Sequence, residues 1–318
     1  MTISLEFALK NLSSLESSTE KKLVLANGFC TPGYWVIVAT MARLRGYNAS
    51  NISFQNRSQE DYAKALALHE NLDSSNLYEY TRVNEGKNYS LLTQLAGPHD
   101  IDRATSSINS CIRTVCSQSN ESKGLRDLYS VVGELHDNIW SHGMKLGFSM
   151  AQIYNGWIEF SLADFGLGFR QEMTRVGLEV ESHSDAISWC MQEGNSTKMT
   201  TASESQWDQK VPDDMMGGSP YGSSVKTFDT ENNHQGLGLF KLKELIKNYN
   251  GHLVVSSGDS LYTFNNTQQE KFTTLDNPWQ GVAISCKFKL SKLNRVDATQ
   301  ETSAISDLMS LFGGEESK

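Results

Sequence analysis

The spacing of apolar residues in the first third of the chain predicts a strand, a helix and a second strand. Residues 23–26 form a short apolar run that fits a buried strand, 34–46 carry apolar residues at helical spacing, and 49–54 fit another strand. A strand, a helix and a strand in this order predict a βαβ unit with a right-handed crossover. Helical spacing recurs at 58–72 and at 101–117, and the chain between them is polar and poorly periodic.

A second series of elements is predicted further along the chain. Helical spacing predicts a helix at about 125–142, and strand patterns at 148–154 and 157–163 flank the hairpin-forming pair Asn155-Gly156. The remaining expected elements are, in chain order, a helix at 183–193, a helix at 237–249 and strands at 252–257, 260–265 and 281–290.

Three polar stretches divide the chain. The first, 117–124, has the composition of a linker and places a domain boundary between residues 100 and 122. The second, 194–235, is too long for an ordinary connection in a compact domain and is typical of a lid or a disordered insert. The tail, 291–318, has one short apolar cluster and is interpreted as a frayed end, with a docking helix as the alternative. Two domains agree with 318 residues at about 150 residues per domain.

The composition argues against several classes of protein. With 37 acidic and 28 basic residues the formal net charge is −9, which argues against a general nucleic-acid-binding surface. No apolar run approaches the roughly 20 residues that span a bilayer. The N-terminus lacks the pattern of a secretory signal, so we expect a cytoplasmic protein that does not contact membranes. Five scattered cysteines without a CxxC pair argue against a disulfide framework or a zinc site.

The first candidate site lies on the helix predicted at 125–142. At about 100° per residue, four polar residues fall on one arc beside the apolar face, namely Glu134, Asn138, Ser141 and His142. The carboxylate of Glu134 can take a proton from a water molecule, and the amide oxygen of Asn138 one turn later can ligate a hard cation such as Mg²⁺. The alternative interpretation is a solvated helix edge.

The second candidate site is the sequence Asp164-Phe-Gly166-Leu-Gly168, directly after the strand predicted at 157–163. A carboxylate at a strand end can accept a hydrogen bond from an exocyclic amine. The two glycines allow a flat ligand to approach the backbone closely. A tight turn explains this short motif equally well.

The third candidate site is Gly236-Leu237-Gly238-Leu239, at the start of the helix predicted at 237–249. The first N–H groups of a helix have no partner within the helix, and its dipole is positive at this end. Both properties suit a phosphate group. Taken alone, a glycine-rich helix start is weak evidence for a ligand.

In this order, ExxxN on a helix, DxGxG after a strand and GxGLF at a helix start resemble the ATP-binding domain of the GHKL superfamily. Its members include gyrase-type ATPases, heat-shock chaperones, mismatch-repair ATPases, histidine kinases and anti-sigma-factor serine kinases. The resemblance covers about 122–290, with similar segments at 250–258 and at 278–282, where Val282 replaces the usual Thr. It implies a two-layer α/β sandwich of the Bergerat type, in which helices cover one face of a mixed sheet, and it implies ATP and Mg²⁺ as ligands.

The resemblance also implies roles for single residues. Glu134 would be the general base, Asn138 would hold Mg²⁺ against the phosphates, and Asp164 would bind the adenine amine. Residues 194–235 would be the ATP lid, in which Lys198 could reach a phosphate, with an ordinary exposed lysine as the alternative. The remaining residues would shape the base pocket and cradle phosphate, namely Gly166, Gly168, Gly236, Leu237, Gly238 and Leu239.

The residues around Glu134 distinguish branches of the family. Glu134 resembles the general base of the ATPase and serine-kinase branches, which many histidine kinases lack, so it favours hydrolysis or transfer to a hydroxyl group. No helix pair with an HExxxP-like signature precedes it, which argues against an autophosphorylating histidine kinase. His136 points to another side of the helix and is interpreted as structural, whereas His142 either lines the site or packs.

The first segment resembles a STAS-like domain, which precedes a GHKL domain in some bacterial proteins. This resemblance rests on the order of strand, loop, helix and strand and on Pro32 in the loop. STAS domains are partners of GHKL serine kinases in anti-sigma systems, where a serine or threonine at a helix start accepts phosphate, and Thr31 lies near that place. The expected division is a STAS-like α/β regulatory domain at 1–116, an ATP-binding domain at 122–290 and a C-terminal tail at 291–318.

Three functions agree with these motifs. The first is a regulator that binds Mg-ATP, hydrolyses it slowly and couples lid closure to the N-terminal domain or to a partner. The second is a serine/threonine protein kinase of the anti-sigma-factor type. The third is a nucleotide-gated interaction module without hydrolysis. In each, ATP and a protein partner or a second copy of the chain are the expected ligands, and membranes and nucleic acids are not.

Overall fold

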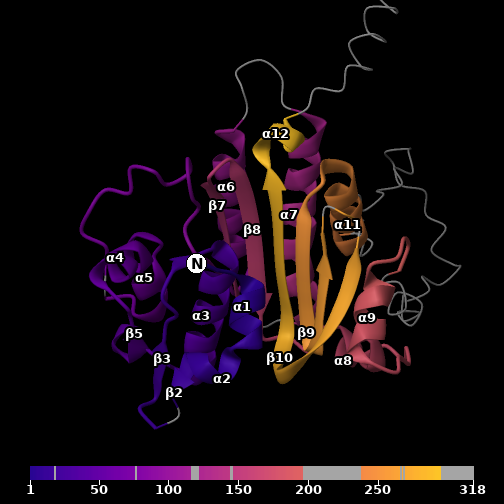
Figure 1. Ribbon diagram of the computed structural model, residues 1–318, viewed down its shortest axis with the longest axis horizontal. Coiled ribbons are helices and arrows are strands. Elements are labelled where there is room, and N and C mark those ends of the chain that lie inside the picture. The colour runs from indigo at the N-terminus through magenta and orange to yellow at the C-terminus, as the bar shows by residue number, and fades with distance from the viewer. Residues whose placement is uncertain are drawn as a thin grey trace, which may run out of the picture.

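A five-stranded sheet forms the centre of the protein (Figure 1). The computed structural model describes residues 1–17, 19–75, 77–115, 122–143, 146–195, 238–265, 267 and 269–294, without the side chains of 140–143. The sheet has the order β6-β7-β8-β10-β9, with β6 at Thr93–Leu95, β7 at Gly147–Tyr154, β8 at Trp157–Asp164, β9 at His252–Phe264 and β10 at Glu270–Lys289. The chain therefore belongs to the predicted α/β class.

All described neighbours in this sheet are antiparallel. The expectation of a mixed sheet is therefore wrong for the described strands. The physical reason is that β7–β8 and β9–β10 are direct hairpins, which impose antiparallel pairing. Strands β8 and β9 run in the same direction, and β10 lies between them. The Bergerat-type assignment stays a prediction.

The turn between β7 and β8 was predicted from its sequence, and this prediction is confirmed. Asn155 and Gly156 have φ values of 49° and 74°, and they connect the paired residues Tyr154 and Trp157. Two-residue turns with positive φ at both positions match the twist of the flanking strands. This turn therefore fixes the register of β8 against β7.

Strands β9 and β10 differ from the predicted pattern. The segments predicted at 252–257 and 260–265 form one strand, in which Gly258 takes a φ of 62° while pairing continues on both sides. Strand β10 begins at Glu270, 11 residues before the predicted start, and its pairing is irregular between Thr274 and Val282. The irregularity lies close to the end of β8, where the candidate site is formed.

Three helices lie on one face of the sheet, namely α6 (Pro98–Arg113), α7 (Lys123–Gly143) and α11 (Gly238–Tyr249). Figure 1 shows α7 running behind the central strands. Their buried residues join one face of the sheet in a single core, which includes Ile108, Val132, Leu242, Phe160, Val255 and Phe288. Helices α8 (Gly168–Arg175) and α9 (His183–Cys190) pack against each other, and α12 (Leu290–Leu293) follows β10. The sequence pattern did not predict α8.

The chain before β6, which we call the N-terminal segment, covers the other face of the sheet. Helices α1 (Leu5–Lys10) and α3 (Pro32–Arg45) pack on it, and α2 (Leu12–Leu15) follows α1. Trp35 of α3 is fully buried in a core that also contains Phe148 of β7 and Ala163 of β8. The central sheet is therefore buried on both faces, although its strands are antiparallel.

The N-terminal segment also contains two small sheets. In the first, β1 (Thr2–Ile3) pairs in parallel with β4 (Phe29–Cys30). In the second, β3 (Lys22–Val24) lies between β2 (Glu16–Ser17) and β5 (Ile52–Ser53), and it is parallel to β5. The predicted βαβ unit is thus present as β3, α3 and β5, with a short 3-10 helix, η1 (Ala49–Asn51), before β5. The STAS-like assignment stays a prediction.

Residues 93–113 share a sheet and a core with residues 122–290. Strand β6 pairs with β7, and α6 packs against α7. The expected division at 1–116 and 122–290, with the boundary between 100 and 122, instead assigns residues 93–113 to the N-terminal domain. The pairing of β6 with β7 was not predicted, because a three-residue strand leaves almost no periodic pattern in a polar segment. The division into domains at 1–116 and 122–290 stays a prediction.

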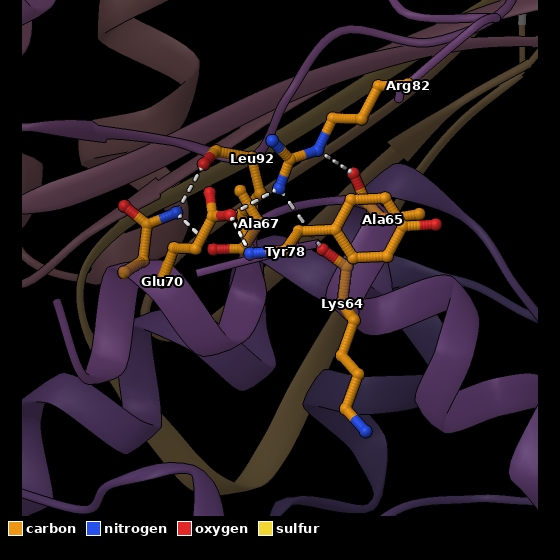
Figure 2. A network of polar contacts seen from close by, with 8 residues as sticks. Lys64, Ala65, Ala67, Glu70, Tyr78, Arg82 and Leu92 are labelled. Carbon is orange, nitrogen blue, oxygen red and sulfur yellow. Dashed lines mark hydrogen bonds and ion pairs between the residues drawn. The ribbon is translucent and has the colours of Figure 1, made fainter. Parts of the chain in front are cut away.

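The helix predicted at 58–72 is divided into α4 (Arg57–Ala65) and α5 (Leu68–Leu72) by Ala67, whose φ is 69°. Arg82 holds the loop after α5 against this break, as Figure 2 shows. Its Nε donates to the Ala65 carbonyl at 2.8 Å, and its Nη2 pairs with Glu70 Oε1 at 2.7 Å. A guanidinium at the end of α4 satisfies carbonyls that have no partner within the helix.

No helix in the described part of the chain has both the length and the apolar character needed to cross a membrane.

The N-terminal segment and the central sheet are joined by a buried carboxylate, Glu159 of β8. Its Oε1 accepts hydrogen bonds from Thr31 Oγ1 at 2.7 Å and from Gly33 N at 3.2 Å. Its Oε2 accepts from the Tyr154 hydroxyl at 2.6 Å. Thr31 precedes α3 and makes no side-chain bond to its own helix, so Glu159 takes the place of an N-cap for α3.

Replacing Thr31 with Val tests this cap. We expect the free energy of unfolding to fall by about 1.5–3 kcal/mol, because a buried carboxylate loses a hydrogen-bond donor. The measurement is chemical denaturation at pH 7. The control is Thr263→Val, whose hydroxyl is exposed and should contribute less than about 0.5 kcal/mol. Equal effects of the two substitutions would contradict the role of Glu159.

Candidate functional site

Helices α7 and α11 run in opposite directions and bring two of the predicted motifs together. A Cβ atom at Gly124, near the start of α7, would lie 2.8 Å from the ring of Tyr249 at the end of α11. At the opposite end, a Cβ atom at Gly238 would lie 3.4 Å from Asn138 Nδ2 and 3.4 Å from Glu134 Cβ. The first turn of α11 therefore lies on the predicted polar stripe of α7.

Glu134 is held by a residue that the sequence motifs do not include. Its side chain is 7% exposed, and its Oε1 forms an ion pair with Lys241 Nζ from the first turn of α11. Ser130 Oγ donates to the same oxygen at 3.4 Å. The sequence signal for Lys241 is its position three residues after Gly238, which places it on the same helix face.

The end of β8 brings the second motif to the same end of the molecule. Asp164 is the last residue of β8 and pairs with Gly147, the first residue of β7. Helix α7 ends at Gly143. The four Cα–Cα steps from Gly143 to Gly147 can span at most about 14 Å, so Asp164 lies near the end of α7 that carries Asn138.

Asp164 is buried, with 6% of its surface exposed. Its Oδ1 accepts a hydrogen bond from Gly166 N at 2.5 Å and another from Val282 N at 3.3 Å. Burial raises the pKa of the Asp164 carboxyl to about 6, and the two hydrogen bonds oppose this shift. Both bonds reach the same oxygen, so Oδ2 is the atom of this carboxylate that can meet a ligand.

Two glycines allow the backbone to close around Asp164. Gly281 has a φ of 92°, and a Cβ atom there would lie 2.6 Å from Asp164 Oδ1. Gly168 has a φ of 75°, and a Cβ atom there would lie 2.7 Å from Ser257 Oγ. A side chain at either position would therefore overlap neighbouring protein atoms. Ser257 and Gly281 lie in the segments 250–258 and 278–282 that share the family resemblance, but no role was predicted for either residue.

Ser257 belongs to this wall through a hydrogen bond. Its Oγ accepts from Phe169 N at 3.0 Å, which fixes the start of α8 against β9. Two consecutive serines, Ser256 and Ser257, are fully buried in β9. A pair of serines directly after the apolar run Leu253-Val254-Val255 is the sequence signal that could have identified this contact, because buried hydroxyls need partners.

His136 faces away from the polar stripe. It is fully buried, its Nδ1 lies 2.8 Å from Thr105 Oγ1 of α6, and its ring packs edge-on against Phe160 of β8. Burial lowers its pKa to about 3, so the ring is neutral at physiological pH. These contacts agree with the interpretation of His136 as a packing residue.

Some of the other predicted site residues lie in the described part of the chain, and the rest lie outside it. Gly166 lies in the turn after β8, and Leu239 is buried in the core beneath α11. Lys198, Gly236 and Leu237 lie outside the described residues, as does almost all of the predicted lid at 194–235, and no side chain is described for His142. The described site thus consists of parts of all three motifs, together with Lys241, Ser257 and Gly281.

A scan against models of protein families finds no match to this chain, and a search of the curated proteins finds no relative. The candidate site is therefore defined by its own residues and geometry. It combines a carboxylate paired with a lysine, an amide beside a helix start, and a second carboxylate in a backbone pocket.

Gly281→Ala tests the close packing at Asp164. The positive φ alone should cost about 1–2 kcal/mol, and the overlap with Asp164 should add about 1–3 kcal/mol. Gly156→Ala is the matched control, because Gly156 has a φ of 74° but no atom within 4 Å of an added Cβ. Thermal unfolding of both variants measures the difference. A loss at Gly281 no larger than at Gly156 would contradict the described wall.

Proposed function

We propose that this end of the sheet binds Mg-ATP and hydrolyses it slowly. The observation that supports the proposal is the juxtaposition of Gly238 with Glu134 and Asn138, near the strand end that carries Asp164. The three segments lie far apart in the sequence, and each has the chemistry that one part of a purine triphosphate requires. The order of the motifs, which resembles that of GHKL proteins, supports the same function.

The adenine end of the ligand is proposed to lie at Asp164. With Oδ1 engaged by Gly166 N and Val282 N, Oδ2 can accept a hydrogen bond from an exocyclic amine. The glycine-rich turn at 164–168 lets a flat base approach the backbone without meeting a side chain. Because Oδ1 accepts two N–H groups, a proton on the carboxyl would lie on Oδ2 and make that atom a donor facing the amine, so the charge state of Asp164 controls this contact.

The phosphate end is proposed to lie at the start of α11. A helix N-terminus offers unpaired N–H groups and a positive dipole end, and Lys241 adds an ammonium group one turn later. Among the described residues, no group of three or more His, Cys, Asp and Glu could hold a metal ion. Asn138 fits the alternative, in which one protein group and the phosphates bind Mg²⁺ together. The cation would supply charge neutralisation at the phosphates.

Glu134 is proposed to accept a proton from the attacking water. Phosphoryl transfer depends mainly on positioning and charge stabilisation, and the described groups provide both. Glu134 lies on a helix rather than on a loop, and Ser130 Oγ donates to its Oε1 at 3.4 Å. This rigidity suits a positioned base, since small displacements reduce general base catalysis.

Nucleotide binding is proposed to reach the N-terminal segment through β8. Glu159 and Asp164 lie on this strand, five positions apart, and Glu159 caps α3. A shift at the end of β8 would therefore be transmitted through Glu159 to the start of α3. This short path agrees with a regulator that couples nucleotide state to its N-terminal segment.

Thr31 is not available as a phosphate acceptor in this structure. It is 1% exposed, and its hydroxyl donates to Glu159. A kinase activity would therefore need an acceptor elsewhere, either on a protein partner or on another copy of the chain. An experiment with labelled ATP distinguishes a kinase from a non-hydrolysing module.

ATP affinity should depend on pH through Asp164. Because its folded pKa is raised to about 6, the carboxyl is ionised above pH 6 and protonated below it. The affinity should fall up to about tenfold per pH unit below 6. Isothermal titration between pH 5 and 8 measures this dependence. Asp164→Asn reports the titration of the nucleotide itself, and Asp61→Asn on α4 is the control. A constant ratio of wild-type to Asp164→Asn affinity would contradict the role of Asp164.

Labelled ATP tests the reaction. Wild type should release free phosphate, and Glu134→Gln should hydrolyse about 10²- to 10⁴-fold more slowly while still binding ATP. Glu244→Gln, which changes a half-buried glutamate of the same helix as Lys241 outside the motifs, should leave the rate unchanged. Label on protein would identify a kinase, and binding without any turnover would identify a nucleotide-gated module. The proposal fails if millimolar Mg-ATP produces neither a titration signal nor thermal stabilisation.

A further inference from the structure

The ion pair between Glu134 and Lys241 joins the proposed base to the helix that would hold the phosphates. The two side chains of this ion pair differ in solvent exposure and in their number of partners. Glu134 is 7% exposed and has a second partner in Ser130, whereas the side chain of Lys241 is 42% exposed. A lysine ammonium sits on a flexible four-carbon stem and can exchange partners. Lys241 is therefore the mobile end of the pair.

The other lysines of α11 have partners on other parts of the protein surface. Lys243 pairs with Glu270 of β10 at 2.8 Å, and Lys247 pairs with Glu244 of α11 at 2.6 Å. Lys241 alone among these three is paired with a motif residue. Its place one turn after Gly238 puts its ammonium at the end of α11 where N–H groups and the helix dipole favour an anion.

We propose that Lys241 distinguishes a nucleoside triphosphate from a diphosphate. Without the terminal phosphate, Lys241 pairs with Glu134 and occupies its Oε1. When a triphosphate binds, Lys241 moves to the terminal phosphate and leaves Glu134 free to meet the attacking water. This inference rests on the proposed function, because it requires the nucleotide to lie with its phosphates at the start of α11.

Variants at the two ends of the ion pair should change nucleotide preference in opposite directions. Lys241→Met removes the contact with the terminal phosphate, so the preference for a non-hydrolysable ATP analogue over ADP should fall about 10- to 100-fold, with ADP affinity little changed. Glu134→Gln releases Lys241 from its competing partner, so the same preference should increase. A merely structural ion pair would not produce this opposition.

The experiment is a titration of each variant with the analogue and with ADP, both in the presence of Mg²⁺. Lys243→Met is the matched control, since it breaks an ion pair of the same helix outside the motifs, and it should keep the wild-type preference. The double variant Glu134→Gln/Lys241→Met removes both charges and so avoids an unpaired buried carboxylate. It should show the same low preference as Lys241→Met.

The outcomes separate this inference from the proposed function. If wild type binds both nucleotides and the preference is unchanged in Lys241→Met and in the double variant, Lys241 does not sense the terminal phosphate, and the proposed function stands. If wild type binds neither nucleotide, both are overturned. An equal loss of preference in Lys243→Met would also overturn the inference, because it would show a general effect of charge on α11.

Discussion

The register of β8 is the constraint on which the site depends. Side chains of a strand alternate between the two faces of a sheet, and a shift of one residue exchanges them. In the observed register, Ile158, Phe160 and Leu162 face the core under α6, α7 and α11. The residues between them face the N-terminal segment, and Glu159 caps α3 from that side. A one-residue shift would turn these apolar residues toward the N-terminal segment and place Glu159 in the apolar core under α6, α7 and α11, without Thr31 and Gly33, so the fold strongly selects this register.

Because the register is fixed, the end of β8 is fixed as well. Asp164 pairs with Gly147 of β7, and it receives an N–H from Val282 of β10. Antiparallel pairing with β7 and β10, on both sides of β8, thus determines where the chain leaves the sheet. The site then needs only one further element, the packing of α11 on α7, to place a helix start beside Glu134 and Asn138. We propose that the nucleotide binds where the register of β8 and the packing of α11 on α7 place these residues at the same end of the molecule.

Local signals in the sequence identified much of this arrangement. The Asn155-Gly156 turn, the helix at 123–143 and the glycine-rich turn after β8 each depend on a few neighbouring residues. Their periodicity or turn chemistry is visible without the rest of the fold. The three-residue strand β6 and the early part of β10 carry no such signal, and their pairing depends on the partner strand.

Contacts between distant residues could not be predicted from the sequence. Lys241 and Glu134 are 107 positions apart, and Thr31 and Glu159 are 128 apart. In each pair one residue, Glu134 or Thr31, lies in a motif or at a helix start that the sequence predicts. No local sequence pattern indicates which residue it contacts. The break at Ala67 has a similar cause, since apolar spacing continues through it while the loop carrying Arg82 caps the end of α4. Sequence motifs therefore suggest which chemistry is present, and packing decides which groups meet.

Hydrogen exchange with and without saturating Mg-ATP tests the central claim, that three separated segments form one nucleotide site. The account predicts slower amide exchange together in the second half of α7, in the turn at 164–168 and in the first turn of α11. The exposed turn at Asn155-Gly156 should exchange at the same rate in both conditions. Protection confined to one of these segments, or located only in the N-terminal segment, would contradict the account.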